Sequence, residues 1–359
     1  MAESEVALVT GFPRLLARGL TRWAMKNGPD HRVKLLVDPE HADDANAFLA
    51  AQPAEWRDRV DVLEGRLGDV DLGLSGAEVR ALLDEVTLVF HADSIHGGPR
   101  MQLRRRNVRS LDAMLALARD MQRLKRLAFF STVFVSGDRS GLVYEEELDC
   151  GQNFRTPYEH SMFLAEQLAR ESMPRLPVTV LRPGSVIGHS RTGESVGLAE
   201  GPNYLVKLMV RLPAEMPFLL PGSGVVPFNI VPIDYVVRAA WALSLAPEAA
   251  GRTFHLTDPN PLSARQAFEL LGDLANRPAP FLGEWPNRLI RRGLKMSGLR
   301  RLAPAKFALF EDLTKHVTYN CSGALELLAR AGISCPPFES YADTLVAWVA
   351  EYERAERAS

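Results

Sequence analysis

The N-terminal segment most constrains the fold, because it reads as a short buried strand, a tight turn and the start of a helix. Residues 5–9 are Glu-Val-Ala-Leu-Val, Thr10 and Gly11 open the turn, and a helical pattern follows from Leu15. In such an opening, glycine lets the backbone approach a phosphate, which the amides at the helix N-terminus hold as an anion. The segment therefore predicts a nucleotide-binding turn at the edge of a sheet.

This turn departs from the glycine spacing that usually carries the function. With the spacing Gly-x-x-Gly-x-x-Gly laid on Gly11, the second glycine falls on Arg14 and the third on Ala17. Alanine is a common substitute, whereas arginine places a long side chain where the backbone should meet a pyrophosphate. Its charge could still contact phosphate from outside. The candidate phosphate-binding residues are Thr10, Gly11, Phe12, Pro13, Arg14 and Leu15.

Short apolar runs alternate with helical segments along the first half of the chain. This alternation favours an α/β fold with a doubly wound parallel sheet, covered on both faces. We predict a Rossmann-like domain over residues 1–185, with residues 226–258 returning to it, and a smaller C-terminal substrate-binding subdomain from residues 186–225 and 259–350. The predicted strands lie at residues 6–9, 32–37, 60–63, 86–90, 126–130 and 178–181, and one long helix is predicted over residues 100–123.

Composition excludes several classes of function. The 42 basic and 44 acidic residues give a formal net charge of −2, so no overall field attracts nucleic acid or an anionic membrane. No apolar run approaches the roughly 18 residues of a spanning helix, and the acidic N-terminus has no secretory core, so we expect a cytoplasmic protein without a membrane span. The three widely spaced cysteines predict neither a disulfide framework nor a metal site. A basic amphipathic stretch at residues 285–306 is either an ordinary helix or a cover for a ligand, an acidic partner or a membrane surface.

The order of several motifs gives the chain a family resemblance. Thr10-Gly11, a strand end at Ser131-Thr132, Tyr158 and Arg182-Pro183-Gly184 follow one another as in the extended short-chain dehydrogenases/reductases. The surrounding sequence is most similar to the thioester-reductase and fatty acyl-CoA reductase-like branch. The resemblance implies an NAD(P) site to which further residues contribute, namely Asp38, Arg66, His91, Ala92, Asn107, Pro183, Gly184 and Val186.

The resemblance also implies a catalytic trio that is incomplete here. Tyr158 takes the proton-transfer position, and Thr132, with Ser131 beside it, takes the hydroxyl position. The lysine expected four residues after the tyrosine is Met162. A thioether carries no charge, so it neither stabilises a phenolate nor holds ribose hydroxyls.

Other departures cluster at the expected cofactor contacts. Arg66 stands where the family usually has an aspartate, Asp38 where this branch often has an arginine, and Asp93 where a small apolar residue is usual. Taken alone, Asp38 is either a ribose ligand or an exposed loop carboxylate. We expect Arg14 or Arg66 to form ion pairs with Asp38 or Asp93 and so fill the groove.

Two functional hypotheses follow. The first is a divergent member that has lost ordinary hydride transfer, binds NAD(P) weakly or not at all, and serves as a binding or regulatory protein or runs a non-redox reaction with Thr132, Tyr158 and His189. The alternative is an active NAD(P)H-dependent reductase of an acyl thioester, aldehyde or ketone, with His160 as a candidate base. Expected partners are a small-molecule or acyl-type ligand or another protein. A homodimer is possible through the helices near residues 100 and 158, for which Met114, Phe163 and Leu164 are expected to be exposed.

Overall fold

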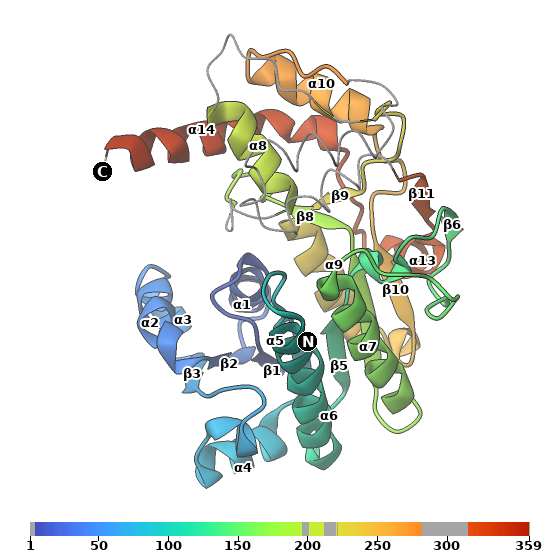
Figure 1. The fold of residues 1–359 in the computed structure, drawn as a ribbon. Helices are drawn as coiled ribbons and strands as arrows, with labels where there is room; N and C mark the ends of the chain where they lie inside the picture. The colour runs from blue at the N-terminus through green and yellow to red at the C-terminus, as the bar shows by residue number, and fades with distance from the viewer. Residues whose placement is uncertain (1–3, 196–200, 212–219, 221, 282–314, 359) are drawn as a thin grey trace.

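One parallel sheet organises the N-terminal two thirds of the chain (Figure 1). The structure, a computed structural model, describes residues 4–195, 201–211, 220, 222–281 and 315–358. Within these ranges the strand order of the main sheet is β10-β7-β5-β4-β1-β2-β3, and every neighbouring pair is parallel. The strands are β1 (Val6–Val9), β2 (Arg32–Val37), β3 (Val60–Glu64), β4 (Leu88–His91), β5 (Arg126–Phe130), β7 (Val178–Pro183) and β10 (Thr253–Leu256).

Helices cover both faces of this sheet, which confirms the predicted doubly wound fold. One apolar cluster joins the sheet to α1, α2 and α9 and includes Phe90 and Trp241, whose rings lie 4.6 Å apart. A second cluster joins the other face to α4, α6 and α7. The helices of the two layers are α1 (Leu15–Asn27), α2 (Ala42–Ala50), α3 (Ala54–Arg57), α4 (Gly76–Glu85), α6 (Ser110–Asp120), α7 (Pro157–Ser172), α9 (Ile233–Leu245) and α13 (Ser322–Arg330).

Side-chain caps fix where three helices begin. Ser75 and Glu78 form a reciprocal capping box at the start of α4, and Ser263 and Gln266 form another at the start of α10 (Ala264–Leu274). Thr156 accepts a hydrogen bond from the Glu159 amide, at 3.1 Å, at the start of α7. Such caps satisfy amides that have no partner within the helix, so they define where each of the three helices begins.

The helix predicted over residues 100–123 is interrupted. It consists of α5 (Arg100–Leu103), a π-helical turn at Arg104–Arg109 and α6. A π-helical turn inserts one extra residue and rotates the side chains that follow. In this turn the Arg106 side chain contacts Asp38, which follows β2. The buried Asn107 side chain contacts Ile95, in the segment that follows β4.

The expected exposure of two apolar side chains on α6 and α7 is wrong. Met114 is fully buried and Phe163 is 8% exposed, because α6 and α7 pack on each other as well as on the sheet. Leu164 is partly buried against the same cluster. A homodimer through these helices remains a prediction. The apolar side chains that were expected to form its interface are buried or partly buried within the chain.

The C-terminal part has its own apolar cluster, and Figure 1 shows its helices grouped at one end of the molecule. This cluster joins α8 (Gly201–Arg211), α10 and α14 (Ala342–Ala358). The domain boundaries stay a prediction, and the basic stretch at residues 285–306 lies outside the described residues.

Two small parallel sheets pair β8 (Ser185–Ile187) with β9 (Ile230–Pro232) and β6 (Gly141–Val143) with β11 (Val317–Tyr319).

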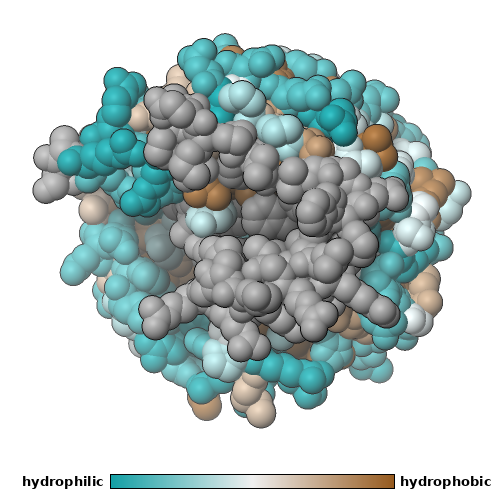
Figure 2. Space-filling view, turned by 45° about the horizontal axis from the view of Figure 1, so that its top comes forward, coloured by the Kyte–Doolittle hydropathy of each residue, from teal (hydrophilic) through white to brown (hydrophobic). Residues whose placement is uncertain are grey.

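The face of the molecule drawn in Figure 2 is mostly polar where it is described. On the face in Figure 2, the coloured residues are largely hydrophilic, with small separate apolar spots. Within the described ranges, no helix combines the length and apolar character needed to cross a membrane. In the same ranges, no three His, Cys, Asp or Glu side chains are grouped as a metal site would require.

Candidate functional site

The turn after β1 keeps its first glycine for reasons of packing. Gly11 has φ of +92°, and a Cβ atom built on it would lie 2.5 Å from the carbonyl oxygen of Ala92. The Thr10 hydroxyl lies 3.3 Å from Nδ1 of His91 and accepts from the Ala92 amide at 3.3 Å. This close approach to the end of β4 requires glycine whether or not a phosphate binds.

The turn offers few backbone donors to a phosphate. Pro13 has no N–H, and the Arg14 amide donates to the carbonyl of Gly11 at 3.1 Å. Phe12 is buried and packs on Phe48 of α2, with the two rings 5.7 Å apart. Leu15 begins α1. The amide arrangement therefore differs from a three-glycine turn in the contacts that a pyrophosphate would need.

An ion pair occupies the position expected for the ribose contact. Asp38 follows β2, and its carboxylate accepts from Arg66 at 2.9 and 3.1 Å. Arg106, from the π-helical turn, contacts the same carboxylate at 3.4 Å. The hydrogen bond from Arg66, more than the other charges, lowers the pKa of Asp38 below its ordinary value. The predicted pairing of Arg66 with Asp38 is confirmed.

Arg106 joins this pair to a second carboxylate. Its guanidinium lies 3.6 Å from Asp93, which follows β4. Burial raises the pKa of Asp93, and the charges of Arg106 and Arg14 oppose that rise. The direct partner of Asp93 is thus Arg106, which sequence reasoning missed, and Arg14 acts on it only as a nearby charge. Two arginines and two aspartates line this end of the sheet edge.

Asn107 connects the same region to α7. Its side-chain oxygen accepts from the Ile95 amide at 2.8 Å, and its amide group donates to the Ile95 carbonyl and to the Ser161 hydroxyl at 3.0 and 2.9 Å. The predicted cofactor residue Gly184 follows β7, where a Cβ atom would lie 2.7 Å from the Asn229 carbonyl oxygen. Pro183 ends β7, and Val186 lies in β8. These residues have structural contacts that account for their identities.

Met162 is a core residue. It is 1% exposed and belongs to the apolar cluster between the sheet and α6 and α7. Tyr158, one turn earlier, packs at the edge of that cluster, and its ring lies edge-on to His96 at 4.6 Å. His96 was not predicted, and nothing but its residue type marks it in the sequence. The tyrosine is therefore next to an imidazole where the family resemblance implies an ammonium.

The two hydroxyl residues after β5 have different partners. Thr132 is 5% exposed, and its hydroxyl accepts from the Phe134 amide at 3.3 Å, which caps the turn η4 (Val133–Ser136). Ser131 instead donates to Glu166 at 2.6 Å and belongs to a buried ionic network. Of the two, only Ser131 belongs to that network, and Thr132 caps the turn against which α7 packs.

The two other histidines named from the sequence lie elsewhere. His189 sits beside Asp234 at the start of α9, with its Nδ1 3.8 Å from the carboxylate. His160 contacts Arg100 at 3.3 Å and the ring of Phe154. Burial, and then the charges of Arg100 and Arg104, lower the pKa of His160.

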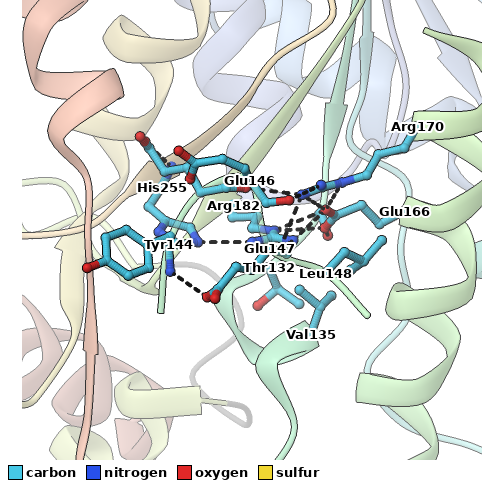
Figure 3. Close-up of polar contacts among 12 residues, drawn as sticks. Thr132, Val135, Tyr144, Glu146, Glu147, Leu148, Glu166, Arg170, Arg182 and His255 are labelled. Atoms are coloured by element: carbon cyan, nitrogen blue, oxygen red, sulfur yellow. Dashed lines mark hydrogen bonds and ion pairs between the residues drawn. The ribbon is translucent and has the colours of Figure 1, made fainter. Parts of the chain in front are cut away.

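A buried ionic network holds the strand ends together (Figure 3). Glu166 of α7 is fully buried and accepts from Arg182 of β7 at 2.6 Å and from Arg170 at 2.9 Å. Although burial opposes ionisation, the charge of Arg182 keeps the pKa of Glu166 below its ordinary value. Arg182 also donates to the Glu147 carbonyl at 2.7 Å and contacts Nε2 of His255 at 3.1 Å. The i, i+4 spacing of Glu166 and Arg170 was the available sequence signal for this network.

Comparisons with known proteins agree with this geometry. The family model described as Male sterility protein, an NAD-binding domain, matches residues 10–240. Aldehyde reductase lnbA of Aspergillus flavus is 27% identical over 257 residues, covering 66% of this chain and 24% of the relative. Carboxylic acid reductase of Segniliparus rugosus is 27% identical over 294 residues, covering 72% of this chain and 24% of the relative. The chain thus spans about a quarter of the length of these relatives.

Solved structures extend the comparison to nearly the whole chain. The terminal R domain from the myxalamid PKS-NRPS biosynthetic pathway aligns with a TM-score of 0.81 and 25% identity, covering 98% of this chain and 92% of that domain. The reductase domain of a nonribosomal peptide synthetase from Mycobacterium tuberculosis aligns with a TM-score of 0.73 and 18% identity, covering 99% and 92%. The predicted thioester-reductase resemblance and Rossmann-like fold are confirmed.

We expect the Arg182→Met substitution to destabilise the fold strongly. It leaves the fully buried Glu166 short of its main cationic partner, and breaking a buried ion pair costs about 3–5 kcal/mol. The free energy of unfolding in urea measures the effect. Arg330→Met is the control, because Arg330 is 58% exposed in its pairs with Glu248 and Glu326, and it should cost less than about 1 kcal/mol. A loss as small as the control's for Arg182→Met would contradict the role of the network.

We also expect stability to fall as the pH is lowered below neutrality. Burial lowers the pKa of His91 and of His255 to about 3. In the unfolded chain both histidines bind protons below about pH 6.5. Between about pH 6.5 and pH 3 the unfolded state therefore binds more protons than the folded state. The free energy of unfolding drops there by up to about 1.4 kcal/mol per pH unit for each histidine. Urea unfolding at pH 7 and pH 5 tests this. His91→Asn should make the dependence shallower, and the control His41→Asn, at a partly exposed site, should not; equal slopes in all three proteins would refute the assignment.

Proposed function

Since this chain belongs to the Male sterility protein family, we propose that it keeps the reductase fold and has lost ordinary NAD(P)-dependent hydride transfer. It serves as a binding or regulatory protein for an acyl-type ligand or a protein partner, or uses the old pocket for a non-redox reaction. The observation that carries the proposal is Met162, which is 1% exposed at the position that the family resemblance assigns to a lysine. A thioether carries no charge and donates no hydrogen bond, so Met162 cannot take the role of that lysine.

The residues of the groove do not fit a dinucleotide bound in the usual way. Pro13 removes one turn amide, and the Arg14 amide is used within the turn. At the ribose end, Asp38 is held by Arg66 and Arg106, so a ribose hydroxyl would have to displace a charge-assisted hydrogen bond. Weak or absent NAD(P) binding follows from these contacts.

The selective pattern of the departures supports the same conclusion. Gly11, Asn107 and Gly184 keep their identities and have packing or hydrogen-bonding roles of their own. Arg14 and Met162 stand at positions whose expected contacts are to the cofactor. A chain that folds as a reductase without using the cofactor would be free to change the residues that contact the cofactor. It would still need the residues that have packing or hydrogen-bonding roles.

A second candidate is an active reductase of an acyl thioester, aldehyde or ketone. It is favoured by the contact of His96 with Tyr158, since an imidazole can donate and accept hydrogen bonds and so pass a proton to or from the phenol. The relatives named as aldehyde and carboxylic acid reductases lend it weight. It requires NAD(P)H to bind despite the ion pairs at Asp38.

A hydride-transfer assay separates the two candidates. The purified chain is mixed with NADH or NADPH and either octanal or octanoyl-N-acetylcysteamine, and cofactor absorbance is followed. We expect no oxidation above the protein-free rate, because the buried thioether of Met162 cannot supply the positive charge that the family resemblance assigns to this position. Turnover would reject the proposal. In that case His96→Ala should abolish the activity and His41→Ala should leave it unchanged if the second candidate is right.

A further inference from the structure

We propose that the exposed arginines of α5 and of the π-helical turn after it form a docking surface for an acidic protein partner. No aspartate or glutamate stands between Asp93 and Asp112 in the sequence. The same stretch contains five arginines, namely Arg100, Arg104, Arg105, Arg106 and Arg109. Because the formal net charge of the whole chain is −2, this positive charge is a local feature of one segment.

Four of these arginines face the solvent. Arg106 turns inward to Asp38 and Asp93, whereas the other four side chains are exposed. Among the residues that the structure describes, no carboxylate forms an ion pair with the members of this arginine cluster, which are Arg100, Arg104, Arg105 and Arg109. The cluster therefore presents positive charge that neighbouring carboxylates do not neutralise.

The cluster is unfavourable for the helix that carries it. The Arg104 amide donates to the Arg100 carbonyl, so these two side chains lie one helical turn apart. Like charges at that spacing destabilise a helix, and cations are disfavoured in the first turn, at the positive end of the helix dipole. The first turn of α5 has no acidic residue to offset them. Folding alone thus gives no reason for these charges, whereas binding a partner does.

The composition of the cluster is typical of a protein interface. Met101, between Arg100 and Arg104 in the sequence, is 78% exposed. Arginine and methionine are enriched in protein interfaces and lysine is depleted, and every basic side chain of the cluster is an arginine. A guanidinium can hold a carboxylate by two parallel hydrogen bonds of fixed geometry. The cluster therefore suits a protein surface that presents carboxylates.

Two other kinds of anionic partner fit less well. Single-stranded nucleic acids are bound by basic grooves with aromatic side chains for base stacking, and residues 94–111 contain no Phe, Tyr or Trp. Membrane-surface segments combine basic residues with an apolar face that enters the lipid. Within residues 94–111, all of which the structure describes, Met101 is the only exposed large apolar side chain. A protein partner is the choice that these side chains favour.

The cluster lies at the edge of the candidate site. The Arg100 guanidinium donates to Nδ1 of His160 on α7 at 3.3 Å. After burial, the charges of Arg100 and Arg104 are what lower the pKa of His160, so both guanidinium groups are near its ring. Tyr158 lies on the same helix, and its ring contacts His96 in the segment before α5. A partner bound to the cluster would thus lie beside the residues that resemble the catalytic ones.

This inference deepens the proposed function by giving the chemistry of the protein partner. It rests on the part of that proposal which assigns the chain a protein partner. The test below uses neither dinucleotide nor acyl substrate, so a negative result would leave the outcome of the hydride-transfer assay untouched, and the reverse also holds.

The experiment compares two peptides of about 16 residues that differ only in charge. One has the repeat Glu-Ala-Ala-Gln and the other the repeat Gln-Ala-Ala-Gln. A glutamate at every fourth position places carboxylates one helical turn apart, which is the spacing of Arg100 and Arg104. Both peptides are titrated by calorimetry at about 0.1 M salt, where the Debye length of about 10 Å confines each charge to its neighbourhood.

Two double variants locate the binding surface. Arg104→Gln with Arg105→Gln removes two members of the cluster, and the control Arg119→Gln with Arg123→Gln removes two exposed arginines near the other end of α6. We expect the wild-type chain and the control to bind the glutamate peptide at least about tenfold more tightly than the glutamine peptide, since several charge-assisted hydrogen bonds act together. The variant of Arg104 and Arg105 should lose most of that preference.

Three results would overturn the proposal. The first is equal affinity of the wild-type chain for the two peptides, which is read without any variant. The second is an equal loss of preference in both double variants, because net charge rather than the cluster would then explain binding. The third is tighter binding of phosphatidylserine vesicles or duplex DNA than of the glutamate peptide, lost in the variant of Arg104 and Arg105, because the cluster would then serve another class of partner.

Discussion

The ion pair between Glu166 and Arg182 is the interaction on which the arrangement of this sheet edge depends. The pair is fully buried and joins α7 to β7. Glu166 also accepts a hydrogen bond from Ser131 after β5, and Arg182 donates one to the Glu147 carbonyl in the loop before α7. A buried charge persists only when its partners are in place, so these segments must assemble together. The network consists of groups of the protein itself, and it fixes how α7 meets the sheet.

That independence explains why so much of the family pattern survives. Gly11 has no room for a side chain against Ala92, Gly184 has none against Asn229, and Asn107 satisfies the backbone of Ile95. Each would be retained by selection for folding alone. By contrast, Arg66 and Arg106 form ion pairs with Asp38 at the expected cofactor contacts. The presence of fold motifs is therefore weak evidence for catalysis in this chain, and the identity of the contact residues is stronger.

Sequence reasoning found the features that depend on neighbours along the chain. The strands followed from apolar runs, and the Arg66–Asp38 pair was one of the pairings expected from the charged residues at the cofactor contacts. It failed where distant segments meet. The continuous helix predicted near residue 100 contains a π-helical turn, because Arg106 and Asn107 turn toward the sheet edge. Likewise, the contact of Lys315 with Ser136 joins residues too far apart for any local pattern to indicate.

The central claim is that protein ion pairs have replaced the cofactor contacts, and NADPH binding tests it most directly. Calorimetry would compare the wild-type chain with Asp38→Ala, which releases Arg66 and Arg106 to bind a phosphate, and with Glu248→Ala, an exposed-site control. The account predicts no NADPH binding at micromolar concentration by wild type or control, and binding at least about tenfold tighter by Asp38→Ala. Micromolar binding by the wild-type chain, unchanged in Asp38→Ala, would contradict it.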